Sequence, residues 1–219
     1  MLALVKELHR LWHENEVLYC HWKSTEALER RLEGDGDLDV LVFQNDAAEV
    51  YRILTDLGFK RLIEMPGKAY PGIEHWLGYC DEDENFAHLH LHFRLVFGKK
   101  FIKEYRFCDE ERILKRRIFS NGVYQINRAD ELFFLFIRSI IKVDFVWVLK
   151  RFLRLEKHYF PNNMLQEYEF LSKKLTTSEI GISKDFFLPG IDSEKLFKAI
   201  KDFNKFTLFE IFSWKFKLK

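Results

Sequence analysis

The stretch EGDGDLDVLVF, Glu33 to Phe43, decides how the first half of the chain is interpreted. Its aspartates alternate with glycine and leucine and lead directly into an apolar segment rich in β-branched residues. Asp37 and Asp39 are two positions apart on the expected strand, so their side chains leave it on the same face. Two carboxylates this close repel each other unless a cation lies between them. A hard divalent ion such as Mg²⁺ is the usual solution, and it commonly comes with substrate phosphates.

The same acidic stretch has a simpler interpretation, which is a solvated surface loop that tolerates three carboxylates. An EF-hand loop is excluded, because that motif needs further oxygen ligands and a late glutamate, whereas an apolar strand follows here. Asp35 lies in the glycine-rich turn and fits a solvated neighbour better than a metal ligand. Of the three acids in this stretch, the metal hypothesis therefore concerns Asp37 and Asp39.

The surrounding patterns predict an α+β fold with a mixed sheet and helices on one face. Apolar residues at helical spacing predict helices over residues 2–13, 25–32 and 46–59. Runs of β-forming residues predict strands over residues 17–22, 37–43, 60–65, 73–83 and 86–98. Helical patterns dominate after Gly98. We therefore expect an α/β domain over residues 1–99 and a mostly helical domain over residues 100–219.

Composition limits the classes of function. The chain has 219 residues and carries 35 basic against 34 acidic side chains, so it gives no strong signal for nucleic-acid binding. Its three cysteines form no CxxC pair, which favours a reducing compartment. No apolar run is long and uncharged enough for a membrane span, and we expect a cytoplasmic protein. Most of the 23 phenylalanines follow Lys100, which indicates a second core or a surface for a protein partner.

The segment before the acidic strand adds a second motif. HWKS, His21 to Ser24, ends one predicted strand, and twelve residues separate Ser24 from Asp37. A strand, a turn with a small hydroxyl residue, a helix and a strand opening with D-x-D resemble the nucleotidyltransferase superfold of DNA polymerase beta and the antibiotic-modifying nucleotidyltransferases. In that pattern Gly-Ser precedes the helix, whereas this chain has Lys23-Ser24.

One branch of the superfold resembles this chain more closely. The pieces HWKS, GDLDVLV, LGF and HLHF follow one another in the order of a poorly characterised nucleotidyltransferase-like family. The version here is also similar to segments associated with bacterial polysaccharide biosynthesis. The resemblance covers roughly Val17 to Val96.

The resemblance implies a role for each matching residue. Ser24 and Lys23 would contact the triphosphate of an NTP, with ATP as the first candidate. Asp37 and Asp39 would hold Mg²⁺, or Mn²⁺, between the phosphates and the reacting oxygens. Active members carry a third carboxylate on a later strand, and this chain has His90 in that place, within HLHLH.

Several interpretations of HLHLH remain open. In the first, His90 replaces the third carboxylate as a metal ligand or general base, which shifts the metal preference toward Mn²⁺ or Zn²⁺. In the second, the site has lost its activity. In the third, His88, His90 and His92 form a zinc site, but such a row is about 13 Å long and one ion cannot reach all three without a bulge. Stacked, partly buried histidines are the simplest alternative, and Glu74 is a substitute third acid.

The leading hypothesis is a metal-dependent nucleotidyltransferase that moves a nucleoside monophosphate from an NTP to a hydroxyl acceptor. Its expected catalytic residues are Asp37, Asp39 and His90, with Lys23 and Ser24 on the phosphates. His88, His92 and Glu74 are secondary candidates. The alternative is a catalytically degenerate module that keeps the fold and binds a nucleotide or a protein partner.

Overall fold

The computed structural model describes residues 1–63, 69–99, 102–107, 109–143, 149, 153, 160–173, 193–202 and 207–217. The chain divides into two compact units. The first consists of Met1–Val96 with Tyr105–Asn127, and the second of Phe97–Glu104 with Arg128–Lys219. Within the described residues, no helix combines the length and the apolar character that crossing a membrane requires.

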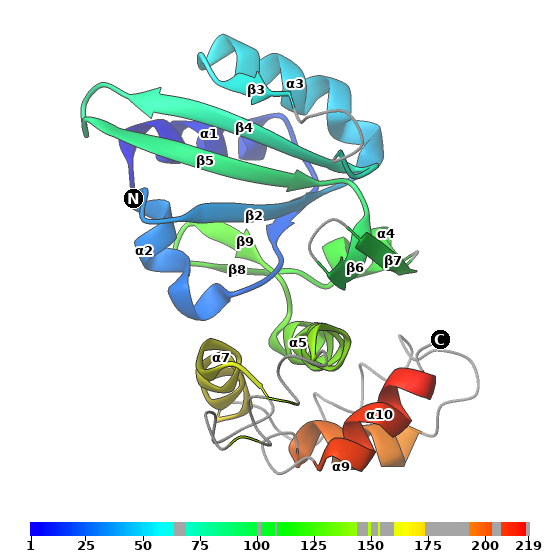
Figure 1. Ribbon diagram of the computed structural model, residues 1–219. Coiled ribbons are helices and arrows are strands. Elements are labelled where there is room, and N and C mark those ends of the chain that lie inside the picture. The colour runs from blue at the N-terminus through cyan, green and yellow to red at the C-terminus, as the bar shows by residue number, and fades with distance from the viewer. Residues whose placement is uncertain are drawn as a thin grey trace. The chain divides into compact units, whose positions relative to one another are not determined.

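The fold is a mixed α/β arrangement, as the sequence predicts. Seven strands of the described residues form one sheet in the order β3-β4-β5-β2-β1-β9-β8. Their bounds are β1 Tyr19–His21, β2 Asp37–Val42, β3 Lys60–Leu62, β4 Ile73–Cys80, β5 Asn85–His92, β8 Ile118–Ser120 and β9 Val123–Gln125. Strand β2 pairs in parallel with β5 and antiparallel with β1, so the sheet is mixed. Figure 1 shows β2 alongside the long strand β5, with β4 on the other side of β5.

Strand β2 is central because its sequence suits burial on both faces. Every residue from Leu38 to Val42 is buried. Leu38, Val40 and Val42 join the main apolar cluster on one face of the sheet. Asp37 and Asp39 alternate with them and therefore lie on the other face. The acidic pair thus stands on the polar face of an otherwise apolar strand.

Helices cover the apolar face. Helices α1 Ala3–Glu14, α2 Leu28–Leu32 and α3 Ala47–Asp56 all contribute side chains to the same apolar cluster. Alternate residues of β5, such as Leu89 and Leu91, join it from the sheet. The period-two pattern of this strand therefore separates a helix-covered apolar face from a polar face.

Several elements differ from the sequence-based expectations. The predicted strands over 60–65 and 73–83 end at Leu62 and Cys80. The predicted helix over 25–32 begins as a 3₁₀ turn, Thr25–Ala27, and only α2 continues it. The predicted strand over 86–98 is two strands, β5 and β6 Leu95–Lys99, because pairing ends at His92. Strand β6 pairs with β7 Ile102–Phe107 in a separate two-stranded sheet.

The turn into β2 depends on glycine. Gly34 and Gly36 have φ angles of 88° and 109°, in the left-handed region that other residues rarely adopt. A Cβ atom on Gly34 would also lie 2.5 Å from Asn85 Nδ2. The glycines in GDGD therefore allow the chain to reverse between α2 and the acidic strand.

The first compact unit extends beyond the boundary expected after residue 99. It includes helix α4 Glu110–Lys115 and the strands β8 and β9. Strand β9 pairs in parallel with β1, and the Leu95 amide donates a hydrogen bond of 3.0 Å to Glu110 Oε1. The division into independent domains stays a prediction.

The described part of the second unit is mainly helical. It contains α5 Arg128–Lys142, α7 Asn162–Ser172, α9 Ser193–Lys201 and α10 Leu208–Lys217. Helix α5 packs against the other three, and Arg138 of α5 forms an ion pair with Glu167 of α7. The sequence of residues 128–160 predicts one long helix or two helices joined near Val143. Helix α5 ends at Lys142, next to that junction, and residues 144–148, 150–152 and 154–159 lie outside the described residues.

Candidate functional site

The polar face of the sheet brings the predicted acids and histidines together. In the parallel ladder of β2 and β5, Asp37 lies opposite His88 and Asp39 lies opposite His90. Paired residues point to the same face of a sheet, so the register alone brings these four side chains together. The contacts bear this out: His88 Nδ1 lies 2.7 Å from Asp37 Oδ1, and His90 Nδ1 lies 3.4 Å from Asp39 Oδ1.

Asp39 is buried and already surrounded by cations. Lys23 Nζ lies 2.8 Å from its Oδ1, and Arg31 Nη1 lies 3.2 Å from its Oδ2. Burial alone raises the pKa of Asp39, but the Lys23 ammonium and hydrogen bonds from His90 and His92 hold this pKa well below its usual range. Asp39 is therefore a permanent anion at neutral pH, with both oxygens engaged by protein side chains.

Asp37 differs from Asp39 in exposure and in partners. Its side chain is 47% exposed, whereas that of Asp39 is 8% exposed. Its nearest partners are imidazoles, because His90 Nε2 lies 3.5 Å from Oδ2 in addition to the close contact from His88. Of the two acids, Asp37 is the one that a ligand from solvent can reach.

A third histidine joins this face from the neighbouring strand. His75 of β4 lies opposite His90 of β5, and the centroids of the two rings are 4.1 Å apart. One nitrogen from each of His75, His88 and His90 lies within 4.8 Å of the others, so the three side chains could hold a metal ion. Sequence patterns do not predict His75 at this site, since the register that pairs it with His90 cannot be inferred from the chain alone.

Two secondary candidates lie elsewhere. Glu74 is opposite Leu91 on the helix-covered face, where it accepts hydrogen bonds from Tyr51 and Trp76. Glu74 therefore does not complete the site. His92 lies on the polar face but is buried, with Nε2 3.4 Å from Asp39 Oδ1, and burial lowers its pKa to about 4.

Lys23 and Ser24 occupy the turn after β1. Ser24 has a left-handed backbone, with φ 55° and ψ 44°, and its side chain does not cap the following 3₁₀ turn. The chain after Ser24 forms a 3₁₀ turn and then only the short helix α2, so a helix dipole adds little to any phosphate site here. The side chain of Lys23 reaches across the polar face to Asp39, which places one cation directly beside the acidic pair.

The donor set does not match a two-carboxylate Mg²⁺ site. Mg²⁺ requires oxygen ligands in near-octahedral geometry, and Asp39 could offer an oxygen only by giving up Lys23 or Arg31. The other donors beside Asp37 are imidazole nitrogens, which suit transition metals better. We therefore derive no chemical step through a resident Mg²⁺ ion.

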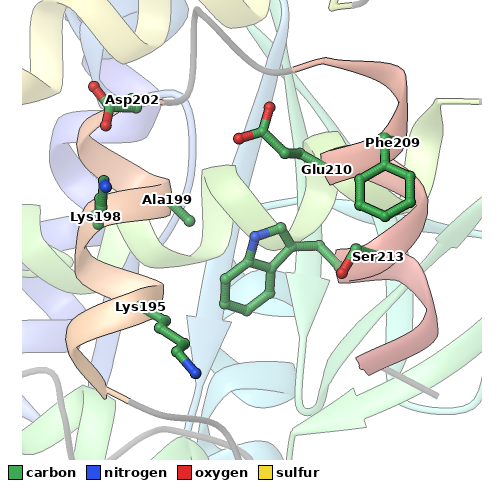
Figure 2. Close-up of a pocket in the computed structure, with 8 residues that line it drawn as sticks. Lys195, Lys198, Ala199, Asp202, Phe209, Glu210 and Ser213 are labelled. Carbon is green, nitrogen blue, oxygen red and sulfur yellow. The ribbon is translucent and has the colours of Figure 1, made fainter.

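The described hollows of the chain lie at other residues. A pocket of about 280 Å³ lies between α9 and α10. Figure 2 shows Lys195 and Lys198 on one helix, with Asp202 just after it, and Phe209, Glu210 and Ser213 on the other. None of the residues predicted from the sequence lines it. We place the candidate site on the polar face of the sheet, because the acids, cations and imidazoles contact one another there.

Comparison with known proteins gives structural likeness only. No family model and no curated protein matches the chain. The antibiotic-resistance factor ANT(2'')-Ia is similar with a TM-score of 0.42 and 12% identity, over 82% of this chain and 86% of that one. The lincosamide antibiotic adenylyltransferase LnuA has a TM-score of 0.36 and 15% identity, over 60% of this chain and 83% of that one. JHP933 from Helicobacter pylori has a TM-score of 0.36 and 12% identity, over 99% of this chain and 92% of that one. Likeness at this level carries no weight for what this chain binds or does.

Proposed function

We propose that the polar face of the sheet binds the triphosphate of an NTP and transfers the nucleoside monophosphate to a hydroxyl acceptor. One observation carries this proposal, which is the continuous series of contacts Lys23–Asp39–His90–Asp37–His88. It unites the two segments, HWKS and GDLDVLV, on which the resemblance to nucleotidyltransferases rests.

The charged side chains of this face suit both the binding of phosphates and the removal of a proton from the acceptor. Lys23 and Arg31 supply two cations whose side chains are 22% and 21% exposed, so that phosphate oxygens can reach them. In the proposed transfer, the acceptor oxygen attacks the α-phosphorus, the bond to the bridging oxygen breaks, and pyrophosphate leaves. The hydroxyl proton passes to His90, which lies between the carboxylates of Asp37 and Asp39.

A thermal-shift titration with ATP and the other NTPs, each with Mg²⁺ or Mn²⁺, tests the binding step. Ligand at about a hundredfold excess over Kd stabilises a fold by about 2.7 kcal/mol, or about 5–10 °C for a chain of this size. We expect such a shift for the intact protein and its loss in Asp37→Asn, because the exposed Asp37 would contact the divalent ion that accompanies the triphosphate.

Asp35→Asn is the matched control. It removes the same charge two residues away, where the carboxylate is exposed and pairs with Arg30. This variant should keep the shift. The absence of a metal-dependent shift with every NTP would contradict the proposal.

The second candidate is a degenerate module that binds a nucleotide without transferring it. The engagement of both Asp39 oxygens by Lys23 and Arg31 favours this candidate. Incubating the protein and a cell lysate with NTP labelled at the α-phosphate separates the two. Label that becomes covalently attached to a lysate component, and fails to do so with Asp37→Asn, supports transfer. A thermal shift without incorporated label supports the degenerate module.

A further inference from the structure

Three imidazoles from two adjacent strands converge on the polar face. His75 and His90 are a register pair across β4 and β5, and His88 precedes His90 by two residues on the same face. Ring centroids lie 4.1 Å apart for His75 and His90, 4.6 Å for His88 and His90, and 5.6 Å for His75 and His88. The pairing of β4 with β5 thus arranges His75, His88 and His90 in a triangle, whereas the histidines of HLHLH alone form a row.

The spacing of the nitrogens suits a single ion. One nitrogen of each ring lies within 4.8 Å of the others. Around tetrahedral zinc with bonds of about 2.0–2.1 Å, ligand nitrogens are about 3.3 Å apart. Side-chain rotations that move each nitrogen by about an ångström would shorten these separations to those of a zinc site, without a shift of the backbone.

Asp37 sets the orientation of His88. With Asp37 ionised, the contact of 2.7 Å requires His88 to donate Nδ1–H to Oδ1, which leaves the lone pair on Nε2. This Nε2 is buried and has no hydrogen-bond partner among the described residues. A buried nitrogen without a partner is costly, and a carboxylate on the far side of a histidine is the usual support for a metal-bound imidazole.

His90 makes only long contacts with the two carboxylates. Its nitrogens lie 3.4 and 3.5 Å from Asp39 Oδ1 and Asp37 Oδ2. Both separations exceed the roughly 2.7–2.9 Å of a charge-assisted hydrogen bond. A small rotation can therefore bring one of its nitrogens to an ion shared with His75 and His88.

We propose that His75, His88 and His90 bind one divalent transition-metal ion of the Zn²⁺ class, with Asp37 as the positioning residue for His88. Neutral imidazoles favour such ions over Mg²⁺. Three protein ligands leave a fourth position open for water or a substrate oxygen, as in catalytic rather than structural zinc sites.

The metal site goes beyond the proposed nucleotidyl transfer and does not depend on it. In the metal-loaded protein, His90 is a ligand and is not available as a base. Titration with a metal ion alone uses no nucleotide, so a failure of the metal site and a failure of nucleotide binding are separate results.

Titration of the full-length, metal-stripped protein with Co²⁺ tests the site, because Co²⁺ in a low-symmetry imidazole site absorbs visible light. We expect one Co²⁺ per chain, displaced by one equivalent of Zn²⁺ but not by a large excess of Mg²⁺. His75→Gln and His88→Gln should each weaken binding by at least about 100-fold. Asp37→Ala should weaken it by about 10–100-fold, because His88 Nδ1 loses the carboxylate that orients the ring.

His92→Gln and His13→Gln are the matched controls and should keep the metal. His92 lies two residues beyond His90 on the same face, and His13 bonds to Tyr19 away from the triangle. Metal binding that survives in His75→Gln but is lost in Asp39→Asn would overturn the proposal in favour of a carboxylate site. Circular dichroism of each metal-free variant confirms that it is folded.

X-ray absorption of the zinc-loaded, unmodified protein needs no variant. Three imidazole nitrogens at about 2.0 Å in the first shell support the site. A shell of oxygens alone, or no bound zinc after gel filtration, overturns it.

Discussion

At the scale of single residues, the two aspartates of GDLD have different roles although they share a face. Asp39 is buried between Lys23 and Arg31, whereas Asp37 is half exposed and faces imidazoles. The buried acid is held by its cations, and the exposed acid orients a histidine. Losing Asp39 would leave Lys23 and Arg31 without their shared counter-charge, so it should cost stability rather than binding alone.

Three buried histidines predict how stability depends on pH. Burial lowers the pKa of His9 and His92 to about 4, and burial beside His9 lowers that of His21 well below its usual value. The unfolded chain takes up these protons near pH 6.5, so it binds more protons than the folded chain between about pH 6.5 and 4. The free energy of unfolding should therefore fall as pH falls through this window.

The expected slope is about 1.4 kcal/mol per pH unit for each histidine that stays neutral in the fold. Urea unfolding at several pH values, with a chelator present, measures it. His92→Gln should lower the slope by the contribution of one histidine, about 1.4 kcal/mol per pH unit. A free energy of unfolding that stays constant from pH 6.5 to 4.5 would contradict the assigned burial.

At the scale of elements, strand β4 places a side chain of the candidate site on one face of the sheet and core side chains on the other. Its residue His75 faces the polar site, while Trp76 joins the apolar cluster. Gly78 lies on the same face as Trp76, and a Cβ atom there would be 2.6 Å from Phe59 Cε1 and 2.8 Å from Leu4 Cδ2. The glycine allows Leu4 of α1 and Phe59 to approach the strand that carries His75.

Gly78→Ala should therefore destabilise the fold by about 1–3 kcal/mol through overpacking. Denaturant unfolding measures the loss. The double variant Leu4→Ala/Gly78→Ala should lose less free energy of unfolding than the two single variants together, by about 0.5 kcal/mol or more. Leu4→Ala removes one of the groups with which the new Cβ atom clashes. Strict additivity would show that Leu4 does not limit this approach.

At the scale of the whole molecule, the first compact unit is discontinuous in sequence. Residues 105–127 return to it after a segment that belongs to the second unit. Strand β9 covers the edge of β1, and Val123 enters the apolar cluster. The boundary expected after residue 99 would expose β1 as an edge strand.

A fragment of residues 1–127 should unfold cooperatively in urea. A fragment of residues 1–99 should have a clearly lower midpoint, because it lacks β8, β9, α4 and the bond from Leu95 to Glu110. Equal midpoints would show that residues 105–127 add nothing to the first unit. Circular dichroism and tryptophan fluorescence follow both transitions.

Local sequence patterns predict most elements of the first hundred residues and the polar face that carries Asp37, Asp39, His88 and His90. Side-chain direction alternates with period two along a strand, so these assignments need only local information. The left-handed glycines before β2 likewise follow from the GDGD turn.

The tertiary structure alone decided which other residues reach that face. It brought His75 to His90, gave Asp39 the cations Lys23 and Arg31, and turned Glu74 to the helix side. These outcomes depend on strand order and register, which are set by long-range pairing. A shift of one residue in the register would exchange His75 and Glu74 between the faces, and no local pattern in the chain fixes that choice.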